Sequence, residues 1–357
     1  MSDFFDRIVS WQRQHGRHQL PWQNTQDPYR IWLSEIMLQQ TQVATVIPYY
    51  EKFLATFPTV AALAAAPAEQ VMALWAGLGY YTRARNLHAC AKQIVTDWGG
   101  RFPPTAATIA TLPGIGPSTA AAIAAFAYGE RSPIMDGNVK RVFTRHFGID
   151  GDPQKRAVEQ RLWALAHAQL PTEDGPGIDA DMRAYTQGLM DLGATLCKRG
   201  SPDCGRCPVK ESCVALREAR QHELPTPRSR KPLPERETLL LLIECNGAAW
   251  VEPRPNEGIW GGLFSLPEAM DTSALRQALL DRQINSAPPM EKLTPLVHTF
   301  THFRLTMHPY RVVLTAGSPA GAGRWLAYSD VPEAGLPAPI KKLLGALPQE
   351  PDLFSGA

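Results

Sequence analysis

The 357-residue sequence lacks the features that mark secreted and membrane-spanning proteins. Six cysteines are too few for a disulfide scaffold in a chain of this length. No apolar stretch approaches the roughly 18 residues that are needed to cross a bilayer. The first residues, MSDFFDRIVSWQRQ, carry charges throughout and lack the apolar core of a signal peptide. We therefore expect a cytoplasmic protein with reduced thiols and no membrane partner.

The sequence also lacks a strong charge of either sign, because its net charge is only +2. The charges are unevenly placed, however. Residues 1–232 hold 26 Lys and Arg against 21 Asp and Glu, a balance of +5, whereas residues 233–357 hold 10 against 13, a balance of −3. A slightly basic first region is compatible with a polyanionic partner such as nucleic acid, although the excess is small.

The apolar pattern predicts two domains built on different plans. Residues 1–215 place apolar side chains at helical spacing between Pro and Gly breaks, which predicts an all-helical region. Residues 216–234 are rich in proline and basic side chains and predict a linker. Residues 235–357 combine strand-like runs, such as 238–244, with a helix near 273–283, so they predict an α+β domain.

Four cysteines form the most informative motif, spaced C-x6-C-x2-C-x5-C: Cys197, Cys204, Cys207 and Cys213. Structural zinc sites usually contain two short cysteine pairs that lie far apart in the sequence. Four thiolates in one short segment instead suit a [4Fe–4S] cluster, which takes four cysteine ligands. The intervening cationic side chains would then be available to phosphates. A structural zinc site without a role in binding is the alternative.

A glycine hairpin, residues 112–116, precedes this motif and leads into an alanine-rich helix expected at 118–128. Gly114 and Gly116 permit a tight turn whose exposed N–H groups, at the start of a helix, would bind a phosphate without reading sequence. An ordinary helix–helix turn would have the same residues. The hairpin is therefore informative about function mainly because it precedes the cysteine motif.

Two carboxylates are candidates for catalysis. Glu35 lies on the apolar stripe of a predicted helix, near Ile31, Trp32 and Leu38, where loss of solvent raises a carboxyl pKa and makes a general acid. Asp136 precedes a predicted helix at 139–147, where it would be an N-cap and also a fixed negative charge. Structural roles are the alternative for both, a core Glu bound to a helix end and a simple N-cap. The side chain of Asn138 could orient Asp136 by hydrogen bonding.

Taken in order, the hairpin, Asp136 and the four cysteines resemble the helix-hairpin-helix DNA glycosylases with an iron–sulfur cluster. In the endonuclease III branch a nucleophilic lysine follows the hairpin, and here that position is Ser118, so this resemblance implies no Schiff base and no strand cleavage. Residues 20–22, 34–42 and 77–83 identify the chain more narrowly as a member of the adenine DNA glycosylase (MutY) family. The similarity extends over nearly the whole chain.

The resemblance implies a six-helix hairpin lobe at about residues 26–135 and a second lobe that combines the N-terminal helix with residues 136–215. It implies a monofunctional glycosylase that hydrolyses the N-glycosidic bond of adenine mispaired with 8-oxoguanine, or with guanine, in base excision repair. The partner would be double-stranded DNA that contains such a mispair. We expect a monomer, associated with the nucleoid if the source is bacterial.

The same resemblance assigns roles to individual residues. Glu35 would protonate the adenine ring, and Asp136 would stabilise the oxocarbenium-like sugar. Ser118 keeps a hydroxyl at a position where some members carry tyrosine. Tyr80 would insert into the base stack. The pocket for the flipped adenine would be formed by Arg17, Leu20, Trp22 and Gln187. The 8-oxoguanine would be surrounded by Gln40, Thr41 and Leu78.

The second domain resembles a Nudix hydrolase fold, but it lacks the run of Glu residues that binds Mg²⁺ in those hydrolases. The helix expected near 273–283 contains no such acidic cluster. The domain is therefore interpreted as a reader of 8-oxoguanine, and not as a phosphohydrolase. Its candidate reading loop contains Phe300, Thr301 and His302; an ordinary strand end is the alternative for this segment.

Two other functions stay open at this point. One is a glycosylase for a different mismatched base, such as thymine in a G·T pair, which Gln40, Thr41 and the second domain disfavour. The other is a non-catalytic, redox-responsive DNA-binding protein that uses its cluster as a sensor. The presence of both Glu35 and Asp136 disfavours that function.

Overall fold

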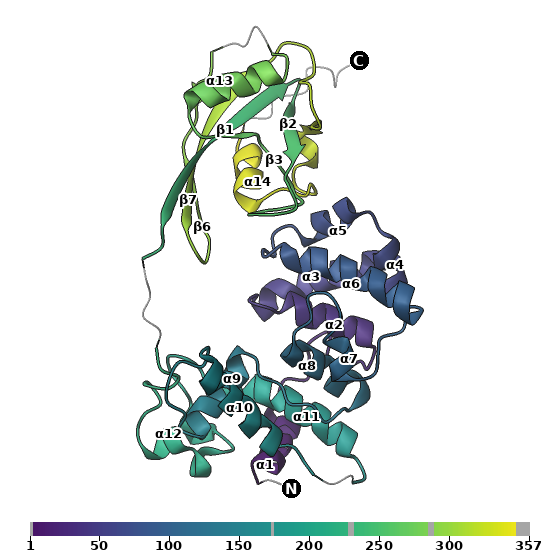
Figure 1. The fold of residues 1–357 in the computed structure, drawn as a ribbon, viewed down its shortest axis with the longest axis vertical. Coiled ribbons are helices and arrows are strands. Elements are labelled where there is room, and N and C mark those ends of the chain that lie inside the picture. Colours follow the sequence, from purple (N-terminus) through teal and green to yellow (C-terminus); the bar gives the residue numbers. More distant parts are fainter. Residues whose placement is uncertain (1–2, 173–174, 228–231, 285–288, 348–357) are drawn as a thin grey trace. The chain divides into compact units, whose positions relative to one another are not determined.

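The computed structural model describes residues 3–172, 175–227, 232–284 and 289–347 (Figure 1). Two compact units are present: residues Met1–Ala65 with Asn86–Arg230, and residues Ala66–Arg85 with Lys231–Ala357. We call them the helical unit and the mixed unit. Among the described residues, no helix combines the length and the apolar character needed to cross a membrane.

The helical unit contains no strand among its described residues, as the sequence predicts. Its helices are α1 (Asp3–His15), α2 (Pro28–Met37), α3 (Val43–Thr56), α4 (Val60–Ala65), most of α6 (Thr82–Trp98), α7 (Ala106–Ile109), α8 (Pro117–Tyr128), α9 (Gly137–His146), α10 (Arg156–Ala168), α11 (Ile178–Asp191) and α12 (Val214–Arg217). A π-helical turn, Leu192–Leu196, extends α11, and short 3-10 turns occupy Cys204–Arg206 and Lys210–Ser212.

Local signals explain where these helices begin and end. Asp27 caps α2 by accepting a hydrogen bond from the Tyr29 N–H, and Pro28 occupies the first turn, where its missing N–H costs nothing. Gly116 precedes Pro117 at the start of α8, and Gly129 ends that helix in the left-handed conformation. The expected helix at 118–128 is therefore confirmed with one additional residue at its start.

The N-terminal helix packs with α11, which lies far from it in sequence (Figure 1). Phe4 and Phe5 of α1 enter a core that also contains Phe143 of α9 and Tyr185 of α11, and the ring centroids of Phe5 and Tyr185 are 4.6 Å apart. Burial of these aromatic side chains fixes α1 against α9 and α11.

The mixed unit contains α5 (Ala68–Trp75), the first turn of α6 and a twisted sheet with two helices. Its strands are β1 (Glu235–Cys245), β2 (Ala248–Pro253), β3 (Phe264–Ser265), β4 (Glu268–Ala269), β5 (Glu291–Lys292), β6 (Leu296–Thr299), β7 (Arg304–Val313) and β8 (Arg324–Ala327). Its helices are α13 (Thr272–Asp281) and α14 (Ala338–Gly345). The α+β character expected for the second domain is confirmed.

The sheet has the order β3-β2-β1-β7-β5, with β1 and β7 parallel over ten residue pairs from Glu235–Arg304 to Glu244–Val313. Residues Leu240–Ile243 of β1 are fully buried, which explains their unbroken apolar run, since a central parallel strand is covered on both faces. Leu275 and Leu279 of α13 pack against this strand.

The segment between the units is partly packed. The Leu224 side chain is buried, and its carbonyl oxygen accepts a hydrogen bond from Arg145 Nε at 2.8 Å. The first half of the expected linker, residues 216–234, therefore packs on the helical unit. Residues 228–231 of this linker lie outside the described residues.

Candidate active site

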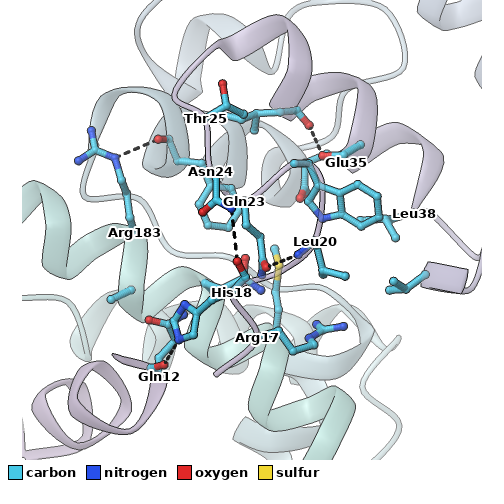
Figure 2. A pocket seen from close by; sticks show the side chains of 18 of the residues that line it. Gln12, Arg17, His18, Leu20, Gln23, Asn24, Thr25, Glu35, Leu38 and Arg183 are labelled. Atoms are coloured by element: carbon cyan, nitrogen blue, oxygen red, sulfur yellow. Dashed lines mark hydrogen bonds between the residues drawn. The ribbon is translucent and has the colours of Figure 1, made fainter. Parts of the chain in front are cut away.

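The helical unit contains a cavity of about 330 Å³ between the loop that precedes α2, α2 itself and α11 (Figure 2). Figure 2 shows Glu35 and Leu38 of α2 together with Arg17, Leu20 and Gln23 of the preceding loop around this space. The cavity brings together Glu35 and the four residues expected to hold adenine, Arg17, Leu20, Trp22 and Gln187. Its size lies in the range of small-molecule sites, about 300–1,000 Å³.

Glu35 reaches the cavity from the apolar side of α2. Ile31 is 2% exposed and Trp32 is fully buried, so the carboxyl group has little access to water on the helix side. This desolvation, with a smaller contribution from the negative charge of Asp136, raises the pKa of Glu35 to about 8. At neutral pH the carboxyl group therefore holds a proton, and the electrostatic influence of Asp136 places both acids in one region.

Asp136 is the N-cap of α9, and its Oδ1 accepts a hydrogen bond from the Val139 N–H at 2.7 Å. Burial raises the pKa of this carboxyl group, while the backbone N–H groups of Val139 and Asn138 and the charge of Arg141 act in the opposite direction. The helix start thus holds the carboxylate in a fixed direction.

Asn138 and Ser118 form different hydrogen bonds in the segment around Asp136. The side-chain oxygen of Asn138 accepts a hydrogen bond from Arg141 Nη2 at 2.9 Å, and its backbone N–H, not its side chain, acts on Asp136. The side chain therefore faces Arg141 instead of Asp136. The Ser118 hydroxyl accepts a hydrogen bond from the Met135 N–H at 2.8 Å, and Met135 directly precedes Asp136.

The glycine hairpin is exposed to solvent at Gly114 and Gly116. Gly114 has a φ of +75°, and a Cβ at this position would lie 2.6 Å from Asn86 Cβ. Gly116 is the N-cap of α8, and its position has open space around it. A backbone phosphate could therefore approach the first N–H groups of α8 closely.

Asp191 was not found from the sequence, although it organises the cavity wall. Its side chain is fully buried and accepts three hydrogen bonds: from the Arg17 backbone N–H at 2.8 Å, from Arg17 Nε at 2.6 Å and from Gln187 Nε2 at 2.9 Å. The spacing of Gln187 and Asp191, four residues on one helix, was a weak signal for a shared face. The contact with Arg17 spans 174 residues of sequence and could not be found in this way.

The residues expected around 8-oxoguanine belong to both units. Gln40 is exposed with a φ of +58°, and the Thr41 hydroxyl donates to the Gln39 carbonyl at 3.4 Å. These two residues follow α2 in the helical unit. Leu78, which is 6% exposed, and Tyr80, which is 42% exposed, belong to the mixed unit.

The mixed unit has a second cavity, also of about 330 Å³, which Tyr80 shares with the candidate reading loop of Phe300, Thr301 and His302. Trp260 lies beneath this loop, with its ring centroid 5.2 Å from that of Phe300. Phe300 also stacks on Phe303 at 4.7 Å. The aromatic contacts support the loop from within, and the Thr301 and His302 side chains remain exposed.

The four cysteines of the motif gather on the helical unit. Burial raises the pKa of the Cys207 thiol to about 12, and negative charge on the other three cysteines acts in the same direction, so the four sulfurs influence one another. Arg145 Nη1 lies 3.4 Å from Cys197 Sγ, and Arg141 Nε donates to the Cys197 carbonyl at 2.8 Å. Helix α9, which Asp136 caps, therefore contacts the cysteine loop with two arginines.

Among the described residues, no three Cys, His, Asp or Glu side chains are grouped closely enough to hold a single metal ion. A [4Fe–4S] cluster would instead take its ligands from four cysteine thiolates. Four cysteines within mutual electrostatic range, with two arginines against Cys197, fit the donor set of such a cluster.

Comparisons with known proteins match two parts of the chain to two families. Residues 33–167 match the HhH-GPD superfamily of base excision DNA repair proteins, and residues 238–346 match the NUDIX domain. A solved thermostable thymine-DNA glycosylase is 29% identical, with a TM-score of 0.52 over 60% of this chain and 95% of that one. The fold expected from the sequence, a helix-hairpin-helix glycosylase region followed by a Nudix-like domain, is confirmed.

Two relatives extend the likeness across both units. The adenine DNA glycosylase of Buchnera aphidicola subsp. Schizaphis graminum is 33% identical over 345 residues, which cover 96% of this chain and 97% of that protein. The human adenine DNA glycosylase is 34% identical over an alignment of 406 residues, covering 95% of this chain and 73% of the human protein. The chain belongs to the adenine DNA glycosylase family.

Proposed function

We propose that this protein is a monofunctional DNA glycosylase that hydrolyses the N-glycosidic bond of adenine mispaired with 8-oxoguanine or guanine in double-stranded DNA. One observation carries the proposal: Glu35, whose pKa is raised to about 8 mainly by burial, lines a base-sized cavity and is influenced by the negative charge of Asp136. A proton donor beside a fixed anion is the pair of groups that a reaction through an oxocarbenium-like sugar needs.

The reaction begins when adenine leaves the duplex and occupies the cavity of the helical unit. Glu35 donates its proton to a ring nitrogen, so the electrons of the breaking C1′–N9 bond move into a neutral leaving base. The Asp136 carboxylate stabilises the positive charge that develops on the sugar. Water then adds to C1′, and its proton returns to Glu35, which restores the acid for the next turnover.

The remaining cavity residues orient the base. Arg17 and Gln187 present polar groups that Asp191 holds in place, and Trp22 and Leu20 supply apolar surface. Ser118 cannot form a Schiff base. Its hydrogen bond to the Met135 N–H supports a role in holding the loop that carries Asp136.

A single-turnover assay on duplexes that contain A:8-oxoguanine, A:G or T:G tests the function. We expect adenine release from the first two substrates and strand breaks only after alkali, because Ser118 occupies the position after the hairpin where a nucleophilic lysine would stand. Faster loss of thymine than of adenine would favour the alternative function, a glycosylase for thymine in a G·T pair. The T:G duplex is included because the chain is similar to a thymine-DNA glycosylase.

The protonation of Glu35 predicts the pH dependence of this reaction. Glu35 acts as an acid, so its contribution is complete below its pKa of about 8 and is lost as the pH rises through that value. On the acidic side the rate falls when Asp136 takes up a proton, at a pH above the usual range for an Asp because burial raises that pKa. Single-turnover rates measured across the pH range report both the loss of rate at high pH and the loss at low pH. A rate that stays constant through pH 8 contradicts the assignment of Glu35 as the acid.

We further propose that Cys197, Cys204, Cys207 and Cys213 hold a [4Fe–4S] cluster. When bound, it would fix the loop that carries Lys198, Arg199, Arg206 and Lys210 and so present positive charge to DNA phosphates. We expect four irons and four sulfides per chain in the purified protein. Metal analysis that finds one zinc per chain and no sulfide contradicts this assignment.

The mixed unit is proposed to read 8-oxoguanine through Phe300, Thr301 and His302, with Tyr80 inserted into the stack and Gln40, Thr41 and Leu78 contacting the lesion. Phe300→Ala is expected to reduce the preference for A:8-oxoguanine over A:G by about tenfold, because the loop loses the aromatic contacts with Trp260 and Phe303 that hold Thr301 and His302 in place. Leu280→Ala, an exposed position on α13, serves as the control. If Phe300→Ala slows both substrates equally, the loop does not read the lesion.

We propose that the protein acts as a monomer in the cytoplasm, on DNA of the nucleoid if the source is bacterial. The proposed boundaries are a helical catalytic region at 1–215, a linker at 216–234 and a lesion-reading domain at 235–357. The helical region would comprise a hairpin lobe at about 26–135 and a lobe of the N-terminal helix with residues 136–215.

A further inference from the structure

The loop between α5 and α6 holds Tyr80 in an uncommon backbone conformation. Tyr80 has a φ of +50°, and the two glycines before it also have positive values, +107° at Gly77 and +73° at Gly79. A bulky residue rarely adopts this conformation without support from its surroundings. Tyr80 nevertheless leaves 42% of its surface exposed, so burial of the ring does not supply the whole of that support.

Arg83, in the first turn of α6, contacts this loop from inside. Its side chain is buried, and Nη2 donates to the carbonyl oxygens of Leu78 and Gly79, both at 3.1 Å. Trp75 Nε1 donates to the same Gly79 carbonyl at 3.2 Å. The loop carbonyls are thus bound from two directions, which fixes the path of the chain immediately before Tyr80.

The guanidinium of Arg83 also lies between two aromatic rings. Its central carbon is 5.2 Å from the Trp75 ring centroid and 5.5 Å from that of Tyr80. Burial lowers the pKa of Arg83 to about 10, so the group remains charged at neutral pH and keeps its attraction for both rings. One side chain therefore contacts the backbone of the loop and the ring that the loop presents.

We propose that Arg83 is a positioning residue that preorganises Tyr80 for insertion beside the mispair. This proposal rests on the proposed role of Tyr80 as the inserting side chain. Preorganisation matters because a ring that is already oriented does not have to be ordered when it enters the base stack. Lysine cannot replace Arg83 in this role, because its ammonium group lacks the planar surface that lies against two rings.

A double-mutant cycle on the full-length protein tests the proposal. Arg83→Lys, Tyr80→Ala and the double variant are compared for their affinity to an A:8-oxoguanine duplex relative to a matched duplex. A 2-aminopurine next to the mispair reports unstacking by its fluorescence. Thermal unfolding of each variant separates a loss of stability from a loss of positioning. Arg101→Ala, which removes an exposed charge elsewhere, is the control for net charge.

We expect Arg83→Lys to lower the preference for the mispair by roughly tenfold and to reduce the 2-aminopurine signal. In the Tyr80→Ala background, Arg83→Lys should have no further effect, because the ring that Arg83 positions is absent. Additive losses would overturn the role of Arg83 while leaving Tyr80 as the inserting residue. If Tyr80→Ala alone changes neither measurement, the insertion itself is wrong and the proposal for Arg83 falls with it.

Discussion

Glu35→Gln is expected to slow single-turnover release of adenine by about 10²–10⁴-fold, the usual contribution of a general acid. Glutamine keeps the size of the side chain and its position on α2, but it has no proton of suitable acidity to give to the base. Affinity for a duplex with A:8-oxoguanine should stay close to that of the unchanged protein. The rate should also lose its decline near pH 8, because Glu35 is the group that titrates there.

The matched control for this variant is Glu51→Gln. Glu51 lies exposed on α3, so it has the same chemistry without the desolvated surroundings. It should leave the rate and the pH profile unchanged. Retention of the full rate by Glu35→Gln would remove Glu35 from the mechanism, and an equal loss of rate and duplex affinity would make it a structural residue.

Asp136→Asn is expected to reduce adenine release by about 10²–10³-fold, the range found when one preorganised stabilising group is lost from an active site. Asparagine is as good an N-cap as aspartate, so it can still accept the hydrogen bond from the Val139 N–H and keep α9 in place. Only the negative charge is removed. The rate should therefore fall far more than duplex affinity or thermal stability.

A second N-cap in the same chain provides the control. Asp271 caps α13 by accepting a hydrogen bond from the Ala274 N–H at 2.8 Å. Asp271→Asn makes the same chemical change at a site without catalytic neighbours, and its rate should equal that of the unchanged protein. Similar losses of rate and affinity in Asp136→Asn would mean that Asp136 only caps its helix.

Local patterns were sufficient for those parts of the candidate site that depend on one helix. The helical spacing of Ile31 and Trp32 around Glu35 predicted an apolar environment, and both side chains are buried. The position of Asp136 before a helix predicted an N-cap, and it caps α9. Such features depend on neighbours within a few residues of sequence, and those neighbours can be read directly.

Features that depend on distant segments were not predictable in the same way. The contact of Asp191 with Arg17 requires the loop before α2 to lie against α11, and no local pattern specifies that arrangement. The Asn138 side-chain oxygen accepts from Arg141, whose guanidinium also donates to the carbonyl oxygens of Gly193 and Cys197, 52 and 56 residues further along the sequence. The hydrogen bond from Arg145 Nε to the Leu224 carbonyl oxygen, in the expected linker, is another example.

The buried carboxylate of Asp191 has a consequence for how the pocket selects its ligand. Because it holds the Arg17 backbone and the Arg17 and Gln187 side chains, the rotamers of both residues are settled before any base arrives. We infer that the pocket is rigid. A base of the wrong shape would then meet donors and acceptors that do not match its own, because these side chains do not rearrange around it. Selectivity would then arise from mismatch with donors and acceptors that are already in position.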